Sequence, residues 1–268
     1  MYAIIPGMLI AQTRTSTLTG TVKEVPKFES KLLGTSRRVM VWLPPGYEKS
    51  NASYPALILL DGQNVFDGAR SYITGEEWRC DETAAGLINA KLITPLIMIA
   101  VDNTGAGRMD EYTTVKTTQG AGKGDTYGRF LAEELMPVMR KQFRLKTGAP
   151  NLGIAGASLG GLISLHFGLT KPATFGKIGG MSPSVWWGER HLLTTAKAFS
   201  GSRPKIWLDI GSSESKSAMQ DAQALRNILV GKGWVLGKDL AYVEDLGGEH
   251  NERAWARRFG EMLMFLYR

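Results

Sequence analysis

Residues 153–168 of the 268-residue chain read GIAGASLGGLISLHFG and combine a strand pattern with a helix pattern. The apolar run LGIAG predicts a strand, and LGGLISLHFGL predicts a helix directly after it. Strand, tight turn and helix in this order, with small residues around the turn, are the context of a nucleophile elbow. Gly156, Ser158 and Gly160 supply the pattern G-x-S-x-G, which alone is a weak signal. Ser158 is therefore either a nucleophile or a small residue packed at a strand-to-helix junction.

Apolar runs and helical patterns alternate along the chain. Strands are predicted to end at Pro44 and Pro45 and to cover 56–60, 96–101, 152–156, 175–182, 205–211 and 240–246, and helices to cover 127–143, 218–230 and 252–267. Continuously apolar strands that alternate with helices predict an α/β fold with a mainly parallel sheet covered on both faces. Binding sites in such sheets lie beyond the carboxyl ends of the strands. The glycine-rich stretch 103–128 has little periodicity and is predicted to be a long loop at that end.

The composition argues against several classes of protein. The chain is 43% hydrophobic with a formal net charge of +7, but its 32 basic residues are scattered among 25 acidic ones, which favours a solvated basic surface over nucleic-acid binding. Cys80 is the only cysteine, so an intrachain disulfide and a cysteine-based metal cluster are excluded. The apolar runs are shorter than the about 20 residues of a membrane helix. We therefore expect no nucleic-acid or membrane partner.

The N-terminal segment 1–20 is set apart from a single domain predicted over 21–268. It begins MYAIIPGMLIAQT, which is apolar and runs into Ala-Gln like the tail of a secretory signal, yet it lacks a basic region. One interpretation is a signal remnant, which predicts a secreted or periplasmic protein. The other is an N-terminal edge strand, which leaves a cytoplasmic location open.

A serine nucleophile needs a base, and the chain has three histidines. His166 lies in the helix after Ser158 between apolar residues, where a packed role is favoured. His191 precedes the strand predicted at 205–211, which is the wrong place in chain order. His250 follows the last predicted strand in GGEHNERAW, as the order serine, acid, histidine requires. His250 is the predicted base.

The acid is expected in DIGSSESKSAMQD, at the end of the strand predicted at 205–211. Glu214 is the predicted acid, because Asp209 lies within that strand and Asp221 lies on the next helix. The alternative for Glu214 is an acid that only favours the helix dipole or caps the helix. In the catalytic interpretation its carboxylate holds the His250 tautomer and stabilises the imidazolium.

Two backbone amides are predicted to form an oxyanion hole. The N–H of Leu159 lies at the start of the helix after Ser158. The N–H of Gln63 is the predicted second donor in LILLDGQNVFDG, where Gly62 is expected to let the backbone turn sharply. Asp61 is predicted to be a turn-forming or network carboxylate and not a catalytic acid.

Three stretches carry a resemblance to a known family: PALILLDGQNVFDG, the run from DTYGRF to SPSVWW, and GGEHNERAWARRF. Together they resemble the esterase D-like putative esterases of the α/β-hydrolase superfamily, from about Ser36 to the C-terminus. The family includes feruloyl and acetyl esterases, siderophore esterases and acyltransferases. The resemblance implies the α/β-hydrolase fold, Ser158 as nucleophile, His250 as base, an acid in the loop of Glu214, and the oxyanion amides above. The glutamate departs from the family, which often has aspartate there.

Four residues are predicted to contact substrate. Trp186 and Trp187 are expected to wall an acyl or sugar pocket, and Arg108 and Tyr112 lie on the long loop. The alternatives are tryptophans that pack a loop on the core and an arginine in a loop salt bridge.

The sequence thus predicts a serine carboxylic-ester hydrolase with a Ser-His-Glu triad and an acyl-enzyme intermediate, acting on a carbohydrate-linked acetyl or feruloyl ester or a similar small ester. No metal or organic cofactor is needed for this chemistry. A siderophore esterase, an acyltransferase with the same triad and a non-catalytic binding module are the alternatives. The oligomeric state is left open.

Overall fold

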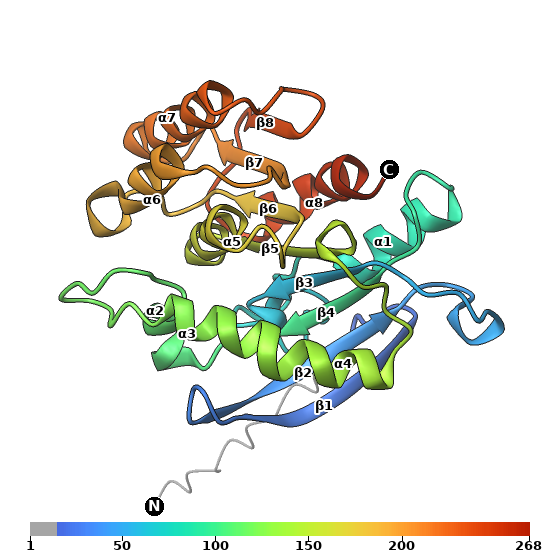
Figure 1. Cartoon of the computed structure of the whole chain (residues 1–268). Helices are drawn as coiled ribbons and strands as arrows, with labels where there is room; N and C mark the ends of the chain where they lie inside the picture. The colour runs from blue at the N-terminus through green and yellow to red at the C-terminus, as the bar shows by residue number, and fades with distance from the viewer. Residues whose placement is uncertain (1–14) are drawn as a thin grey trace, which may run out of the picture.

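The computed structural model describes residues 15–268, so the signal or strand interpretation of residues 1–14 lies outside the described part. Eight strands form one sheet in the order β1-β2-β4-β3-β5-β6-β7-β8 (Figure 1). Strands β3 to β8 pair in parallel, whereas β2 runs antiparallel to β1 and β4. The mainly parallel sheet is confirmed. The strands are β1 (Thr21–Ser30), β2 (Thr35–Leu43), β3 (Ala56–Leu60), β4 (Ile97–Val101), β5 (Leu152–Ala157), β6 (Lys177–Met181), β7 (Lys205–Gly211) and β8 (Leu240–Asp245).

Helices cover both faces of the sheet. Alternate residues of a strand point to opposite faces, so Ile58 and Leu60 join one apolar core and Leu57 and Leu59 join the other. The first core is closed by α3 (Gly124–Arg129), α4 (Met136–Gln142), α5 (Leu159–Thr170), α6 (Trp187–Ala198) and α7 (Lys216–Gly231), and the second by α1 (Cys80–Asn89) and α8 (Glu252–Tyr267). Between residues 15 and 268, no helix has both the length and the apolar character needed to cross a bilayer.

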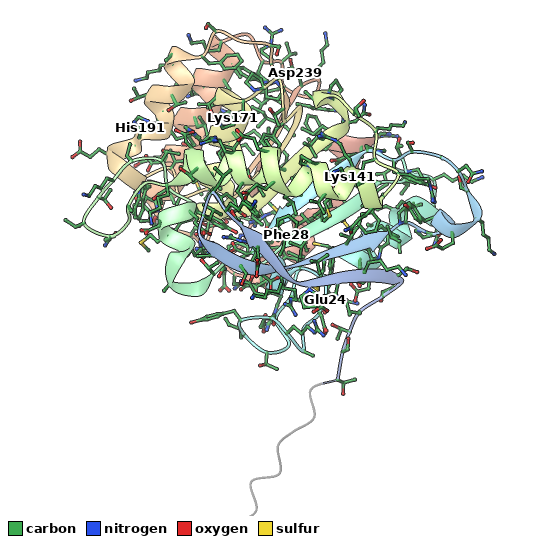
Figure 2. The ribbon with its side chains drawn as sticks, turned by 60° about the horizontal axis from the view of Figure 1, so that its bottom comes forward. Glu24, Phe28, Lys141, Lys171, His191 and Asp239 are labelled. Carbon is green, nitrogen blue, oxygen red and sulfur yellow. The ribbon has the colours of Figure 1, made fainter. Side chains whose placement is uncertain are left out.

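Two elements differ from the sequence prediction. Strand β1 was not expected, because most of its side chains are exposed at the edge of the sheet. Its Phe28, labelled in Figure 2, packs edge-on against Phe130 with ring centroids 6.0 Å apart. The helix predicted at 127–143 is divided into α3, a π-helix (Phe130–Leu135) and α4. The extra residue of a π-turn shifts the helical register, which a fixed 3.6-residue period does not describe.

The long loop predicted at 103–128 is only partly irregular. It contains a short 3₁₀ segment (Gly105–Gly107), the one-turn helix α2 (Arg108–Glu111) and the start of α3. These turns are too short to produce a periodic apolar pattern, which is why the sequence predicts a loop. The segment follows β4 and so lies at the carboxyl edge of the sheet, as expected.

Residues 15–20 form hydrogen bonds with the segment that precedes α1 and with the first turn of α1. The Thr17 hydroxyl donates to Glu77 Oε1 at 2.6 Å, and the Thr19 N–H donates to Asp81 Oδ2 at 2.5 Å. Burial raises the pKa of Asp81 to about 8. This part of 1–20 is not a strand, since β1 begins at Thr21. A single domain over 21–268 stays a prediction, which the joining of eight strands in one sheet supports.

Candidate active site

Ser158 lies on the turn between β5 and α5, with φ 58° and ψ −122°. A positive φ is costly for a residue with a Cβ atom and is held only where the surroundings enforce it. The surroundings are tight, because a Cβ atom on Gly156 would lie 2.7 Å from the carbonyl carbon of Gly160. The strained strand-to-helix turn expected of a nucleophile elbow is thus present.

We expect Ser158→Gly to be more stable than Ser158→Ala by about 1 kcal/mol, because glycine adopts this backbone conformation without the Cβ penalty. The measurement is the free energy of unfolding of both variants in urea. Gln220, exposed on α7, gives a matched control. There the order reverses, with Gly less stable than Ala by about 0.5–1 kcal/mol. Equal stabilities for the two Ser158 variants would rule out the strain.

His250 and Glu214 lie on the loops that follow β8 and β7. His250 Nδ1 and Glu214 Oε2 are 2.8 Å apart, and Glu214 Oε1 accepts from the Ser182 hydroxyl at 2.5 Å and from the Gly211 N–H at 3.0 Å. Burial by itself would raise the pKa of Glu214, but these three hydrogen bonds outweigh it and hold that pKa below its usual value. The carboxylate is therefore ionised at neutral pH and oriented toward the imidazole.

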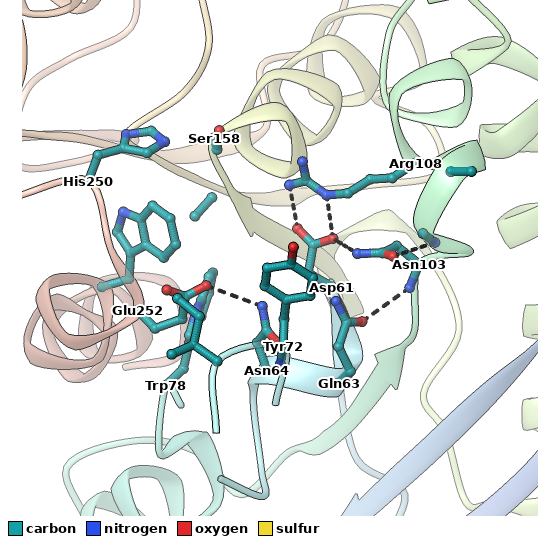
Figure 3. Close-up of a pocket in the computed structure, with 15 residues that line it drawn as sticks. Asp61, Gln63, Asn64, Tyr72, Trp78, Asn103, Arg108, Ser158, His250 and Glu252 are labelled. Carbon is teal, nitrogen blue, oxygen red and sulfur yellow. Dashed lines mark hydrogen bonds and ion pairs between the residues drawn. The ribbon is translucent and has the colours of Figure 1, made fainter. Parts of the chain in front are cut away.

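Ser158 and His250 line the same pocket, and Figure 3 shows both side chains at its rim. The Ser158 hydroxyl lies 3.2 Å from the Ser184 hydroxyl, and the hydrogen bonds found within residues 15–268 do not include one between Ser158 and His250. The contact between a catalytic serine and its base is often long until substrate binds.

The amides predicted as oxyanion donors lie at helix starts. Leu159 is the first residue of α5, and Gln63 lies in a 3₁₀ turn (Gly62–Asn64), where N–H groups have no acceptor within the helix. The sharp turn is made by Asp61, at φ 55°, and not by Gly62 as expected. Gly62 is required for space, since a Cβ there would lie 2.6 Å from the Val101 nitrogen. Gln63 lines the pocket with Ser158.

Asp61 is a network carboxylate, as predicted. Arg108 Nε and Nη2 each donate to it at 2.7 Å, and Asn103 Nδ2 donates at 2.7 Å. The salt-bridge alternative for Arg108 is therefore present, although Arg108 also lines the pocket. Tyr112 is fully buried, outside the pocket lining, and its hydroxyl accepts from the Asp61 N–H at 3.1 Å. Its expected contact with substrate is wrong, because the ring lies beneath the Asp61 turn.

The two tryptophans have different surroundings. Trp187 is 2% exposed and donates to the Val115 carbonyl at 3.4 Å, so it packs the long loop against the core and does not line the pocket. The prediction that Trp187 contacts substrate is therefore wrong, because its indole is buried. Trp186 is 52% exposed and borders a separate cavity of about 210 Å³, which His250 and Glu214 also line. A role of Trp186 near substrate stays a prediction.

The pocket has a volume of about 540 Å³ and combines apolar walls with polar groups. Several of its residues were not found from the sequence: Asn64, Tyr72, Ile73, Trp78, Glu252 and Trp255. Their nearness in sequence to residues that were found is the only signal: Asn64 follows Gln63 directly, and Glu252 and Trp255 lie two and five residues after His250. Within residues 15–268, no group of three or more His, Cys, Asp or Glu side chains is arranged to hold a metal ion.

A buried network lies behind Glu214. The Ser182 hydroxyl accepts from Trp255 Nε1 at 3.1 Å and from Arg258 Nη2 at 2.8 Å while it donates to Glu214. Arg258 also pairs with Asp209 at 3.1 Å. Burial raises the pKa of Asp209 to about 6 despite this pairing. Asp209 therefore lies inside the sheet as predicted, and its contacts support the Glu214 side chain through Ser182.

A mainly parallel sheet with a strained serine turn, and with a histidine–carboxylate pair at its carboxyl edge, defines the α/β-hydrolase fold. The family model described as putative esterase matches residues 30–266, and the chain belongs to this family. Its enzyme class is accordingly carboxylic ester hydrolase, as the sequence predicts.

The chain is similar to proteins of unknown and of named function. The chain is 24% identical over 246 residues to the uncharacterized protein YbbA of Bacillus subtilis, covering 87% of this chain and 93% of that protein. It is 31% identical over 110 residues to a siderophore enterobactin esterase of Emericella nidulans, covering 38% of this chain and 36% of that one. The match therefore spans about a third of the siderophore esterase.

Solved structures share the fold. The BES protein from Bacillus cereus superposes with a TM-score of 0.75 at 21% identity, covering 96% of this chain and 98% of that one. The enterobactin esterase FES from Shigella flexneri superposes with a TM-score of 0.76 at 23% identity, covering 93% of this chain and 60% of FES. The chain spans less than two thirds of FES.

Proposed function

We propose that this protein is a serine carboxylic-ester hydrolase with Ser158 as nucleophile, His250 as general base and Glu214 as the acid that orients the histidine. The observation that carries the proposal is the 2.8 Å pairing of His250 Nδ1 with Glu214 Oε2 beside a pocket that Ser158 also lines. This pairing fixes a proton on Nδ1 and leaves Nε2 free to accept the serine proton.

The reaction proceeds in two halves. The Ser158 oxygen attacks the ester carbonyl carbon while His250 Nε2 takes the hydroxyl proton, and the carbonyl oxygen becomes an oxyanion bound by the Gln63 and Leu159 amides. Collapse breaks the bond to the alcohol oxygen, which receives the proton from His250. Water then attacks the acyl-enzyme by the same route, which releases the acid and restores Ser158.

The substrate is a small-molecule ester, for which a pocket of about 540 Å³ has room. A carbohydrate-linked acetyl or feruloyl ester is the first candidate, supported by the half-exposed Trp186 indole at a cavity that His250 also lines. A siderophore ester is the second, supported by the names of the Emericella nidulans and Shigella flexneri proteins. Transfer of the acyl group to a sugar or alcohol uses the same residues.

The proposal is tested with a fluorophosphonate probe and an ester panel. We expect one probe molecule per chain on the peptide that contains Ser158, no labelling of Ser158→Ala, and full labelling of Ser217→Ala, a serine exposed on α7. The panel contains aryl acetate and butyrate, methyl ferulate, an acetylated xylo-oligosaccharide and a cyclic catecholate ester. Product analysis with an added alcohol separates hydrolysis from acyl transfer. Labelling elsewhere, or no turnover with or without acceptor, would refute the assignment.

A further inference from the structure

Four of the side chains that line the pocket can carry charge: Asp61, Arg108, His250 and Glu252. Asp61 and Arg108 cancel each other, because the guanidinium donates to both carboxylate oxygens at 2.7 Å. His250 pairs with Glu214 behind it. Glu252 is therefore the carboxylate in the wall for which residues 15–268 supply no salt-bridge partner, although the His250 charge, when present, attracts it at longer range.

Glu252 begins α8, directly after the helix cap formed by Asn251. Its Oε1 accepts from Asn64 Nδ2 at 3.2 Å, and the ion pairs found within residues 15–268 do not include it (Figure 3). The next side chain, Arg253, is paired with Glu76. Burial raises the pKa of Glu252, and the nearby charges of Asp61 and Glu76 act in the same direction. The site therefore holds a partly desolvated carboxylate among other acids.

An unpaired carboxylate in a half-enclosed wall attracts groups that donate hydrogen bonds and repels anions. Arg108 does not reverse this preference, because its charge is balanced by Asp61. The overall charge of +7 does not reverse it either, since the basic side chains are spread over the surface and solvent screens them at longer range.

We infer that Glu252 makes this pocket selective for esters that are neutral or cationic and present hydroxyl or ammonium groups, and that it rejects esters with an anionic group. The inference rests on the proposed esterase function and refines its substrate class. Of the two substrate candidates, this inference favours the carbohydrate-linked ester over a siderophore ester that carries anionic groups.

The test uses three aryl acetates with the same reacting ester: 4-carboxyphenyl acetate, 4-carbamoylphenyl acetate and 4-(trimethylammonio)phenyl acetate. In Glu252→Gln, we expect kcat/KM for the anionic ester relative to the neutral amide to rise about tenfold, and the relative value for the cationic ester to fall by a similar factor. Comparing ratios between enzymes cancels the different leaving-group reactivities. Glu261→Gln removes the same charge from an exposed position of α8 and should leave both ratios unchanged.

Binding separates this inference from the proposed function. Ser158→Ala protein is titrated with the same three esters, with the fluorescence of Trp78 and Trp255 in the pocket wall as the signal. We expect the double variant Ser158→Ala/Glu252→Gln to bind the anionic ester, relative to the neutral amide, about tenfold more tightly than Ser158→Ala does. If esters are hydrolysed but the ratios do not change, the inference is wrong and the esterase function stands. If no ester is hydrolysed, the function fails, and the binding ratios alone support or overturn the charge preference.

Discussion

Ser158→Ala is expected to lower kcat by about 10⁵-fold on any ester that the wild-type protein cleaves, because removing a serine nucleophile leaves only binding and oxyanion stabilisation. The alanine keeps the Cβ atom and hence the packing of the strained turn, so the free energy of unfolding should stay close to that of the wild type. Initial rates and active-site titration are measured on the same preparations. A variant rate within tenfold of the wild type would show that Ser158 is not the nucleophile.

Glu214→Gln is expected to lower kcat by about 10³- to 10⁴-fold with a small change in KM. The amide is close in size to the carboxylate, but it lacks the charge that stabilises the imidazolium and can present an N–H to His250 Nδ1, which favours the wrong tautomer. Steady-state kinetics on the best ester measure the loss. Glu249→Gln, an exposed change on the loop of His250, is the matched control and should keep the wild-type kcat.

The lowered pKa of Glu214 gives this variant a pH signature. A carboxyl group with a depressed folded-state pKa stabilises the protein above its unfolded pKa, and this stabilisation is lost as the pH falls through the folded value. We therefore expect the stability difference between the wild type and Glu214→Gln to be full at neutral pH and to shrink below about pH 4. A difference that persists unchanged at pH 2 would mean that the carboxylate charge does not contribute.

Much of the framework could be predicted from the sequence, because apolar periodicity and chain order carry it. The strands β3, β4 and β5 are fully buried apolar runs, and the helix predicted at 252–267 matches α8. The pairing of His250 with Glu214 followed from the order of serine, acid and histidine along the chain. Strand β1 could not be predicted in this way, because an edge strand with one solvent-exposed face lacks a continuous apolar run.

The wall of the pocket could not be predicted, because it depends on contacts between distant segments. Asn64 and Glu252 are 188 residues apart and meet only when the turn after β3 and the start of α8 reach the same edge of the sheet. Trp187 is buried and its neighbour Trp186 is half-exposed, a difference that two adjacent tryptophans in a sequence do not reveal. The sequence correctly predicts the loop that carries Tyr112, but it does not show that the side chain is buried and that its hydroxyl accepts from the Asp61 N–H.

The close contact between Gly156 and Gly160 shows that the pentapeptide GASLG contains one residue kept for packing, Gly156, beside one proposed for catalysis, Ser158. Gly156 is required for space, since any larger side chain there would overlap the backbone of α5, whereas a Cβ atom on Gly160 would come no closer than 3.4 Å to the Asp61 carboxylate. Gly156 would remain necessary for folding if the protein had no chemistry at all. A descendant that abandoned ester cleavage for binding would thus still need Gly156 but could replace Ser158, so that the serine and not this glycine records whether the line still performs catalysis.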